Sequence, residues 1–229
     1  VRVDTERELD TGETTASRAT LLGGQAVRRA ALALCEALRD ASQEALAGQD
    51  FAGEYVVDWT TPLAEGVADP LTHIAYGWAT QVVILDDEGR LARVVAAQDV
   101  GRAINRQTVE GQIEGGVHMG LGYALSEEFV VTDGEPVSDT LKSLHIIPPA
   151  GMPEVEVVIV EEHQPEGPYG AKGAGEAVLV PTAAAVAGAL YAFDGIRRRD
   201  LPMSDSPAAR AAVPKLARAE RQVPEEVAT

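Results

Sequence analysis

The residues best suited to chemistry form a glycine-rich loop, residues 167–176, with the sequence Gly-Pro-Tyr-Gly-Ala-Lys-Gly-Ala-Gly-Glu. Glycine allows a ligand to approach the main chain closely, because it has no side chain to obstruct it. The apolar, alanine-rich residues 177–191 follow and predict a buried helix. Glu176 would then stand at the start of that helix, where backbone N–H groups bind anions and a carboxylate beside them can act as a base.

The loop also fits a simpler interpretation. Glycine-rich turns before helices are often structural, and the helix dipole alone favours a glutamate in the first helical turn. The familiar phosphate-binding patterns are absent, because the loop has no Gly-Lys-Ser or Gly-Lys-Thr and residues 173–175 lack the third glycine of a dinucleotide fingerprint. The loop pattern alone leaves a catalytic and a structural role open.

A second glycine-rich stretch, residues 111–122, contains five glycines among apolar residues that recur with a helical period. Each interior glycine costs a helix about 1 kcal/mol relative to alanine. The stretch therefore predicts close packing against another backbone or a bulky ligand, and tight helix packing explains most of the glycines. Gln112 differs from them, because a polar side chain in such a segment needs hydrogen-bond partners if it is buried.

Hydroxyl-bearing residues precede the first predicted helix, which runs from Leu21 to about Ala47. Residues 14–18 read Thr-Thr-Ala-Ser-Arg. Their hydroxyl groups either cap the helix or hold a cofactor, and the spacing leaves both roles open.

The remaining pattern alternates helices and strands. Further helices are expected over 111–125 and 177–193. Strands are expected at residues 1–5, 54–59, 75–85, 91–98, 127–132 and 153–162. Residues 86–89, Asp-Asp-Glu-Gly, lie between two of these strands and predict a hairpin turn.

Three segments, in order along the chain, resemble the molybdenum-binding subunit of the xanthine dehydrogenase and aldehyde oxidoreductase family. They are residues 14–18, residues 99–105 running into 111–116, and residues 170–176. The resemblance extends from about Asp10 to Met203 and covers only the C-terminal part of a subunit several times longer. It implies an α+β fold of mixed helices and strands, with residues 1–203 as the C-terminal portion of a molybdenum-cofactor-binding domain. Residues 204–229 are expected to be a tail, either a short helix or disordered.

The resemblance also implies roles for particular residues. Glu176 matches the catalytic base of the family, and its carboxylate should have limited access to solvent. Gln112 matches a glutamine that hydrogen-bonds the cofactor. The other expected cofactor contacts are Thr15, Ala16, Ser17, Lys172, Gly173, Ala174 and Gly175, the last four mainly through their backbone amides. The Lys172 side chain could balance cofactor phosphate or a neighbouring acid, or be a plain surface lysine, and no side chain is expected to ligate the metal.

The implied cofactor is a molybdenum–pterin group, either molybdopterin itself or its cytosine dinucleotide form. The implied reaction is hydroxylation of a purine, another heterocycle or an aldehyde with oxygen drawn from water. FAD and iron–sulfur clusters are expected only on other chains or segments, because a single cysteine cannot hold a cluster. Expected partners are the remainder of the molybdenum subunit, iron–sulfur and flavin subunits and a small-molecule substrate, within an oligomer. A stand-alone module that binds a phosphate-bearing molecule and a noncatalytic remnant are the alternatives.

The composition agrees with a globular enzyme and excludes other classes. Of the 229 residues, 45% are hydrophobic and 24% are charged. The net charge of −17 disfavours nucleic acid as a partner. No apolar run reaches membrane-spanning length and no signal peptide is recognisable. Cys35 is expected to be a buried thiol in a reducing compartment, so we expect a cytoplasmic protein, and the start at Val1 suggests a piece of a longer chain.

Overall fold

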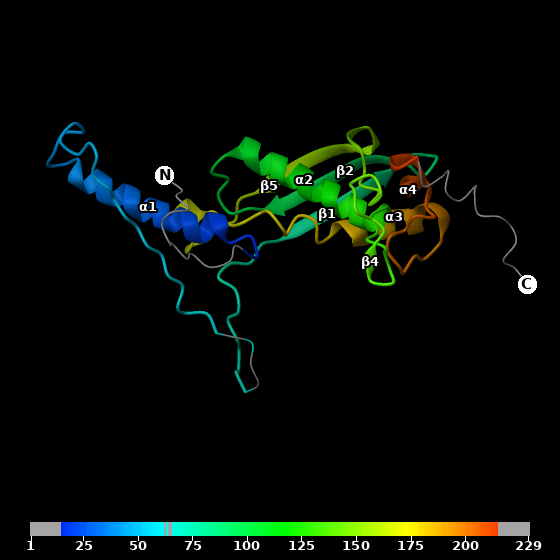
Figure 1. Cartoon of the computed structure of the whole chain (residues 1–229), viewed down its shortest axis with the longest axis horizontal. Helices are drawn as coiled ribbons and strands as arrows, with labels where there is room; N and C mark the ends of the chain where they lie inside the picture. Colours follow the sequence, from blue (N-terminus) through cyan, green and yellow to red (C-terminus); the bar gives the residue numbers. More distant parts are fainter. Residues whose placement is uncertain (1–14, 62, 64–65, 215–229) are drawn as a thin grey trace, which may run out of the picture. The chain divides into compact units, whose positions relative to one another are not determined.

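The computed structural model describes residues 15–61, 63 and 66–214, which form two compact units (Figure 1). The first unit contains the described residues up to Gly77 together with 99–106 and 160–174. The second contains residues 78–98, 107–159 and those from Gly175 onward. Helices and strands are mixed in the chain order, which confirms the predicted α+β class.

A three-stranded sheet forms the framework of the second unit. Strands β1 (Ala79–Leu85) and β2 (Leu91–Asp99) pair antiparallel, and β5 (Glu154–Val160) completes the order β1-β2-β5. The predicted hairpin is thus confirmed. Its turn is closed by Asp86, whose Oδ1 accepts hydrogen bonds from the amides of Glu88 (3.0 Å) and Arg90 (2.8 Å).

Two helices bury their apolar residues in the core of this unit. Helix α2 (Arg106–Leu125) confirms the helix predicted at the second glycine-rich stretch, and α3 (Thr182–Asp194) packs against β1. On α2 the buried side chains recur every four residues, so that one face of the helix is apolar. These side chains are Ile113, Val117, Leu121 and Leu125. Val186 and Leu190 of α3 join the same cluster.

Residues after Met203 also enter this core. The short helix α4 (Pro207–Ala212) begins at Ser206, whose side chain accepts a hydrogen bond from the amide of Ala209. Ala208, Ala209 and Ala212 are buried against the core cluster. The described part of the expected tail is therefore helical and packed, and the boundary at 203 stays a prediction.

The first unit is built on helix α1 (Ala19–Ala37) and the 3-10 turn η2 (Pro168–Gly170). The Gln25 side chain is buried between them, and its Nε2 donates a hydrogen bond to the carbonyl oxygen of Glu166 at 2.8 Å. The Tyr55 hydroxyl donates to the Glu166 carboxylate at 2.7 Å. Partial burial, with the hydrogen bond and charge of Glu166, raises the pKa of Tyr55 to about 12, so that this donor keeps its proton at neutral pH.

Helix α1 differs from its prediction in length and in burial. It ends at Ala37 rather than near Ala47, and residues 38–47 form turns. Ser42 favours a turn there, because its hydroxyl oxygen accepts a hydrogen bond from the backbone amide of Ala45. Cys35, expected to be buried, is exposed. The apolar side chains at the same end of the helix are also exposed, so the described residues do not cover the apolar side of α1.

Helix α3 begins at Thr182 and not at Ala177 as predicted. Pro181 explains the difference, because proline lacks an amide hydrogen and its ring clashes with the carbonyl four residues earlier in a helix. Residues 175–181 form turns instead.

Two strand predictions also differ from the structure, and a third has no described residues to compare with. No strand covers residues 54–59 within the described chain. The strand predicted over 127–132 is reduced to β3 (Val131–Thr132), which pairs with β4 (Glu135–Pro136). The strand predicted at residues 1–5 lies outside the described residues. A further 3-10 turn, η1, spans Pro149–Gly151, and no helix of the described residues has the length and apolar content to cross a membrane.

The glycines of α2 lie on two different sides of the helix. A Cβ atom added to Gly116 would lie 2.7 Å from the Val178 Cβ, and one on Gly120 would lie 2.5 Å from the Thr182 Cβ. These contacts show why the side facing residues 178–182 needs glycine. Gly111 and Gly115 have no neighbouring atom within 4 Å among the described residues.

We therefore predict opposite effects for two alanine substitutions in α2. Gly120→Ala should lower the free energy of unfolding by about 1–3 kcal/mol, because it overpacks the contact with Thr182. Gly115→Ala should raise it by up to about 1 kcal/mol, because alanine is the better helix former and meets open space. Urea unfolding of both variants measures the difference, and equal effects would contradict the two-sided helix.

Candidate cofactor site

The glycine-rich loop is fixed within the first unit by backbone hydrogen bonds and a buried ion pair. The Lys172 amide donates to the Val100 carbonyl at 2.8 Å, and the Arg102 amide donates to the Gly170 carbonyl at 2.9 Å. Lys172 Nζ lies 2.5 Å from Asp99 Oδ2, with the two side chains only 8% and 2% exposed. Three roles were left open for the Lys172 side chain, and the structure supports one of them: the lysine neutralises a neighbouring acid.

Asp99 is the residue of this arrangement that the sequence reasoning did not single out. Besides Lys172, its carboxylate accepts hydrogen bonds from the amides of Gly101 (2.9 Å) and Glu162 (3.3 Å). The sequence did contain a signal, because Asp99 directly follows a predicted strand and is the first residue of one of the three matching segments. The sequence does not show which basic residue would reach it.

Beyond Lys172 the loop presents backbone amides that the protein does not use. Within the described residues, the N–H groups of Gly173 and Ala174 donate no hydrogen bond, and the same holds for Gly175, the first residue of the last segment of the second unit. Successive unpaired amides of this kind form concave sites that bind anions. The predicted contact through loop amides therefore has donors available at residues 173–175, whereas the Lys172 amide is already paired.

The turn at residues 15–17 lies directly against this loop in the first unit. A Cβ atom on Gly173 would overlap the Ser17 carbonyl oxygen, so the two backbones are in contact. Ala16 and Ser17 both have positive φ angles, 51° and 55°, which non-glycine residues adopt rarely and often at functional sites. Helix α1 has Arg18 at its N-cap position and no side-chain hydrogen bond that caps the helix there, so simple capping does not explain this turn. Thr14 lies outside the described residues.

Glu176 occupies a different position from the one predicted. It lies six residues before Thr182, in the turns of residues 175–181, and so is not at the start of α3. Pro181 is the physical reason, as described above. The expectation of limited solvent access is also not met within this chain, because Glu176 is exposed.

Gln112 lies on α2 in the second unit and is exposed, so it has no need of a buried partner. One helical turn further on, Gly116 contacts Val178, and Gly120 contacts Thr182. The chain after Glu176 therefore runs along α2, and Gln112 and Glu176 lie at the same end of this contact.

His118, also on α2, has the structural role that a single histidine most often has. Its Nε2 lies 2.8 Å from the Ile147 carbonyl oxygen. Burial raises the pKa of the nearby Glu127, and the electrostatic effect of His118 opposes that shift without cancelling it. In the described part of the chain, no group of three or more His, Cys, Asp or Glu side chains could hold a metal ion.

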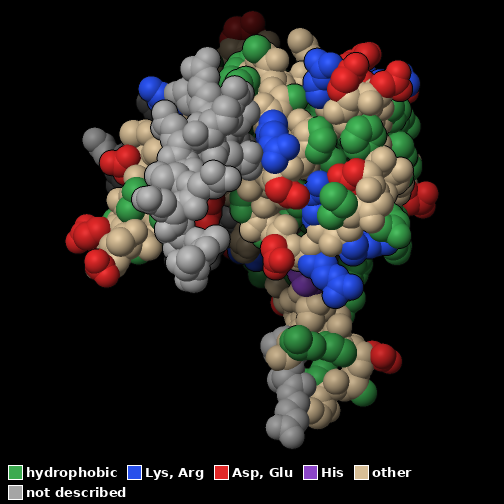
Figure 2. All heavy atoms as spheres, turned by 90° about the vertical axis from the view of Figure 1, so that its right-hand side faces the viewer, with side chains coloured by type: hydrophobic (Ala, Val, Ile, Leu, Met, Phe, Trp, Pro, Cys, Tyr) green, Lys and Arg blue, Asp and Glu red, His purple; other side chains and the backbone are tan. Residues whose placement is uncertain are grey.

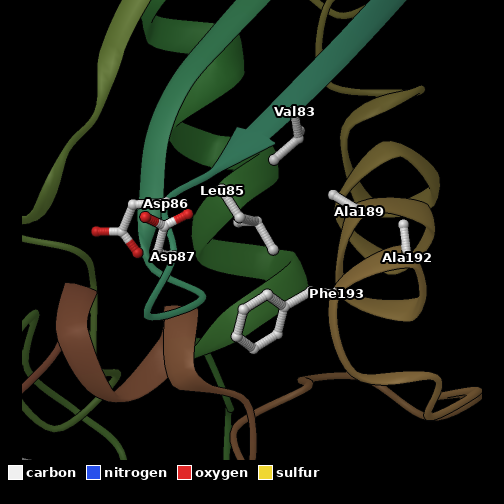
Figure 3. Close-up of a pocket in the computed structure, with 7 residues that line it drawn as sticks. All are labelled: Val83, Leu85, Asp86, Asp87, Ala189, Ala192 and Phe193. Atoms are coloured by element: carbon white, nitrogen blue, oxygen red, sulfur yellow. The ribbon is translucent and has the colours of Figure 1, made fainter.

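A pocket in the second unit lies apart from all of these residues. It has a volume of about 430 Å³ and lies between the β1–β2 turn and the end of α3 (Figure 3). Its lining is Val83, Leu85, Asp86, Asp87, Ala189, Ala192 and Phe193. None of the predicted site residues lines it, and its two aspartates would repel an anionic cofactor.

Surface charges do not indicate a nucleic-acid partner either. On the face turned to the viewer in Figure 2, basic side chains lie among acidic and apolar ones and do not gather into one patch of the described surface. Several arginines are paired with acids, including Arg93 with Glu156 (3.3 Å) and Arg198 with Asp194 (2.8 Å).

Comparison with known proteins agrees with the three matching segments. The model of the molybdopterin cofactor-binding domain family matches residues 50–153. The 6-hydroxypseudooxynicotine dehydrogenase complex subunit gamma of Paenarthrobacter nicotinovorans is 33% identical over 243 residues, covering 89% of this chain and 30% of that protein. The aldehyde oxidoreductase molybdenum-binding subunit of Escherichia coli (strain K12) is 37% identical over 120 residues, covering 51% of this chain and 16% of that protein.

The fold agrees as well. The crystal structure of the aldehyde oxidoreductase from Desulfovibrio desulfuricans aligns with a TM-score of 0.75 and 27% identity, covering 91% of this chain and 24% of that one. The fold and the matches are those of a molybdopterin cofactor-binding domain. The chain belongs to the xanthine dehydrogenase and aldehyde oxidoreductase family, as its sequence motifs predicted. It spans less than a third of the length of each of these three relatives.

We predict that Gly173→Ala disturbs the turn at residues 15–17, because the new methyl group would overlap the Ser17 carbonyl. The variant should be destabilised by about 1–3 kcal/mol, as for other overpacked positions. Thermal unfolding measures this change. The matched control is Gly23→Ala, since Gly23 of α1 has no neighbour within 4 Å among the described residues. Equal melting temperatures for Gly173→Ala and the wild type would show that the two backbones are not in close contact.

Proposed function

We propose that this chain is the C-terminal portion of a molybdenum hydroxylase and supplies one wall of its active site. The observation that carries the proposal is the contact between the 15–17 turn and Gly173, followed by unpaired loop amides. Two segments that match the family at its cofactor are distant in sequence and adjacent in the first unit. A loop with only a structural role would not need three successive backbone N–H groups without hydrogen-bond partners.

The residues present fit an anionic, bulky cofactor. The amides of Gly173, Ala174 and Gly175 would bind phosphate or other anionic oxygen atoms. The 15–17 turn would contact the pterin, and Gln112 would donate a hydrogen bond from its exposed side-chain amide. A molybdenum–pterin group, when bound, would supply the redox chemistry of hydroxylation with oxygen drawn from water. The cytosine dinucleotide form would add a further phosphate for the same donors.

Glu176 would act as the general base. At neutral pH a carboxylate accepts a proton at one of its oxygen atoms, provided that it lies within hydrogen-bond reach of the group that loses the proton. Its position in irregular turns, rather than in a helix, places the side chain at the protein surface where a substrate can approach. The substrate class is an electron-poor carbon of a purine, another heterocycle or an aldehyde.

The remainder of the molybdenum subunit would complete the site. The apolar side chains on the uncovered side of α1 support this, since Val27, Leu34 and Leu38 are 47%, 36% and 41% exposed. On α2, Met119 and Tyr123 are 55% and 57% exposed near the open glycines. Iron–sulfur and flavin groups would belong to other chains or segments of a cytoplasmic oligomer.

The test of this function is Glu176→Gln in the assembled enzyme, which keeps the size of the side chain and removes the proton acceptor. We predict unchanged molybdenum content and a loss of turnover of at least about 100-fold, the low end for general base catalysis. Glu154→Gln is the control, because Glu154 is another exposed glutamate of the second unit. Turnover per bound molybdenum is the quantity to measure. Near-normal turnover in Glu176→Gln would exclude the glutamate as the base, and absence of molybdenum and pterin from the wild-type enzyme would favour a stand-alone phosphate-binding module.

We further predict that Gln112→Ala weakens retention of the cofactor without changing the fold. Because the Gln112 side chain is exposed, its loss should leave the melting temperature unchanged. Molybdenum and pterin content after dialysis measures retention. Gln107→Ala is the matched control, because Gln107 is an exposed glutamine on another side of the same helix. Equal retention in the two variants would remove Gln112 from the site.

A further inference from the structure

We infer that the buried ion pair between Asp99 and Lys172 is a positioning device for the cofactor-binding amides of Gly173 and Ala174. The identity of the ligand rests on the proposed function. The positioning role rests on the geometry of the first unit. Neither Asp99 nor the Lys172 side chain would touch the cofactor in this arrangement.

The pair fixes Lys172 at both ends. The Lys172 amide donates to the Val100 carbonyl at 2.8 Å, and Nζ reaches the Asp99 carboxylate at 2.5 Å. Both partners belong to the same dipeptide at the end of β2. A residue held by its backbone amide and by the tip of its side chain has little freedom to move, so the peptide that follows it starts from a fixed position. That peptide carries the first unpaired amide of the loop.

The same carboxylate also orders the neighbouring chain. Asp99 accepts hydrogen bonds from the amides of Gly101 and Glu162, so that its side chain joins two segments of the first unit, residues 99–106 and 160–174. Gly101 has a φ of +58°, and a Cβ atom there would overlap the Gly170 carbonyl. The segments are thus packed backbone to backbone, and a shift of Asp99 would move the loop.

Stability alone is a poor reason to keep such a pair. Burying two charges removes them from water, and replacing a buried pair by neutral residues is often neutral or stabilising. What the pair adds is a fixed anchor, because neither the buried ammonium nor the buried carboxylate can move away without leaving the other charge unpaired. Asp99 neutralises the charge of Lys172, so the main-chain amides would be the groups that bind an anion. The ion pair holds these amides in position.

The test uses Lys172→Met, Asp99→Asn and the double variant in the assembled enzyme. Each single variant leaves one charge buried without its partner and should melt at a lower temperature. The double variant removes both charges and should recover most of the lost melting temperature. Arg93→Met with Glu156→Gln is the control, because that pair is exposed on the sheet and should contribute little.

Two measurements on the double variant decide the inference. Hydrogen exchange of the Lys172 and Arg102 amides should become faster, because the loop is no longer held. Molybdenum and pterin content after dialysis should fall by about 10–100-fold, the range for residues that orient ligand-binding groups. A recovered melting temperature separates this loss from a general folding defect.

The opposite results would overturn the inference. Unchanged exchange of the two amides in the double variant would show that the pair does not position the loop. Faster exchange with full cofactor retention would show that the loop amides do not bind the cofactor. If the wild-type enzyme contains neither molybdenum nor pterin, the proposed function fails, and the exchange measurement still decides whether the pair holds the loop in place.

Discussion

Close contact at glycine is the constraint on which both units depend. In the first unit Gly173 meets the Ser17 carbonyl and Gly101 meets the Gly170 carbonyl. In the second, Gly116 and Gly120 bring α2 against Val178 and Thr182. A single methyl group at any of these positions would collide with a neighbour that cannot move easily. The glycines therefore allow segments distant in sequence to lie in contact, in addition to making loops flexible.

Much of this architecture could be predicted from the sequence. The helical period of residues 111–125 and the alternation of β1, β2 and β5 were sufficient to identify these elements, because each depends on a local apolar pattern. The family was predicted from three short segments, and comparison with known proteins confirmed it. Motifs of this kind are recognisable because their glycines and polar residues depart from ordinary helix and strand composition.

The failures have physical causes that a local pattern does not contain. The apolar run after Glu176 resembles a helix throughout, but Pro181 delays α3 to Thr182. Cys35 lies in an apolar helix and was expected to be buried, but burial depends on what packs against the helix. The pairing of Asp99 with Lys172 links residues 73 positions apart, and no spacing rule predicts such a partner. The roles of the individual site residues remain predictions for the same reason.

The depth of the Asp99–Lys172 pair has a consequence for the response of the chain to its solution. Dissolved ions screen charges on the surface and act far less on charges removed from water. Arg93–Glu156 and Arg90–Glu88 are exposed, so their attraction weakens as ionic strength rises. The pair beneath the glycine-rich loop is almost inaccessible to solvent and keeps its attraction. The loop geometry is thereby insulated from changes in salt that alter the rest of the charged surface.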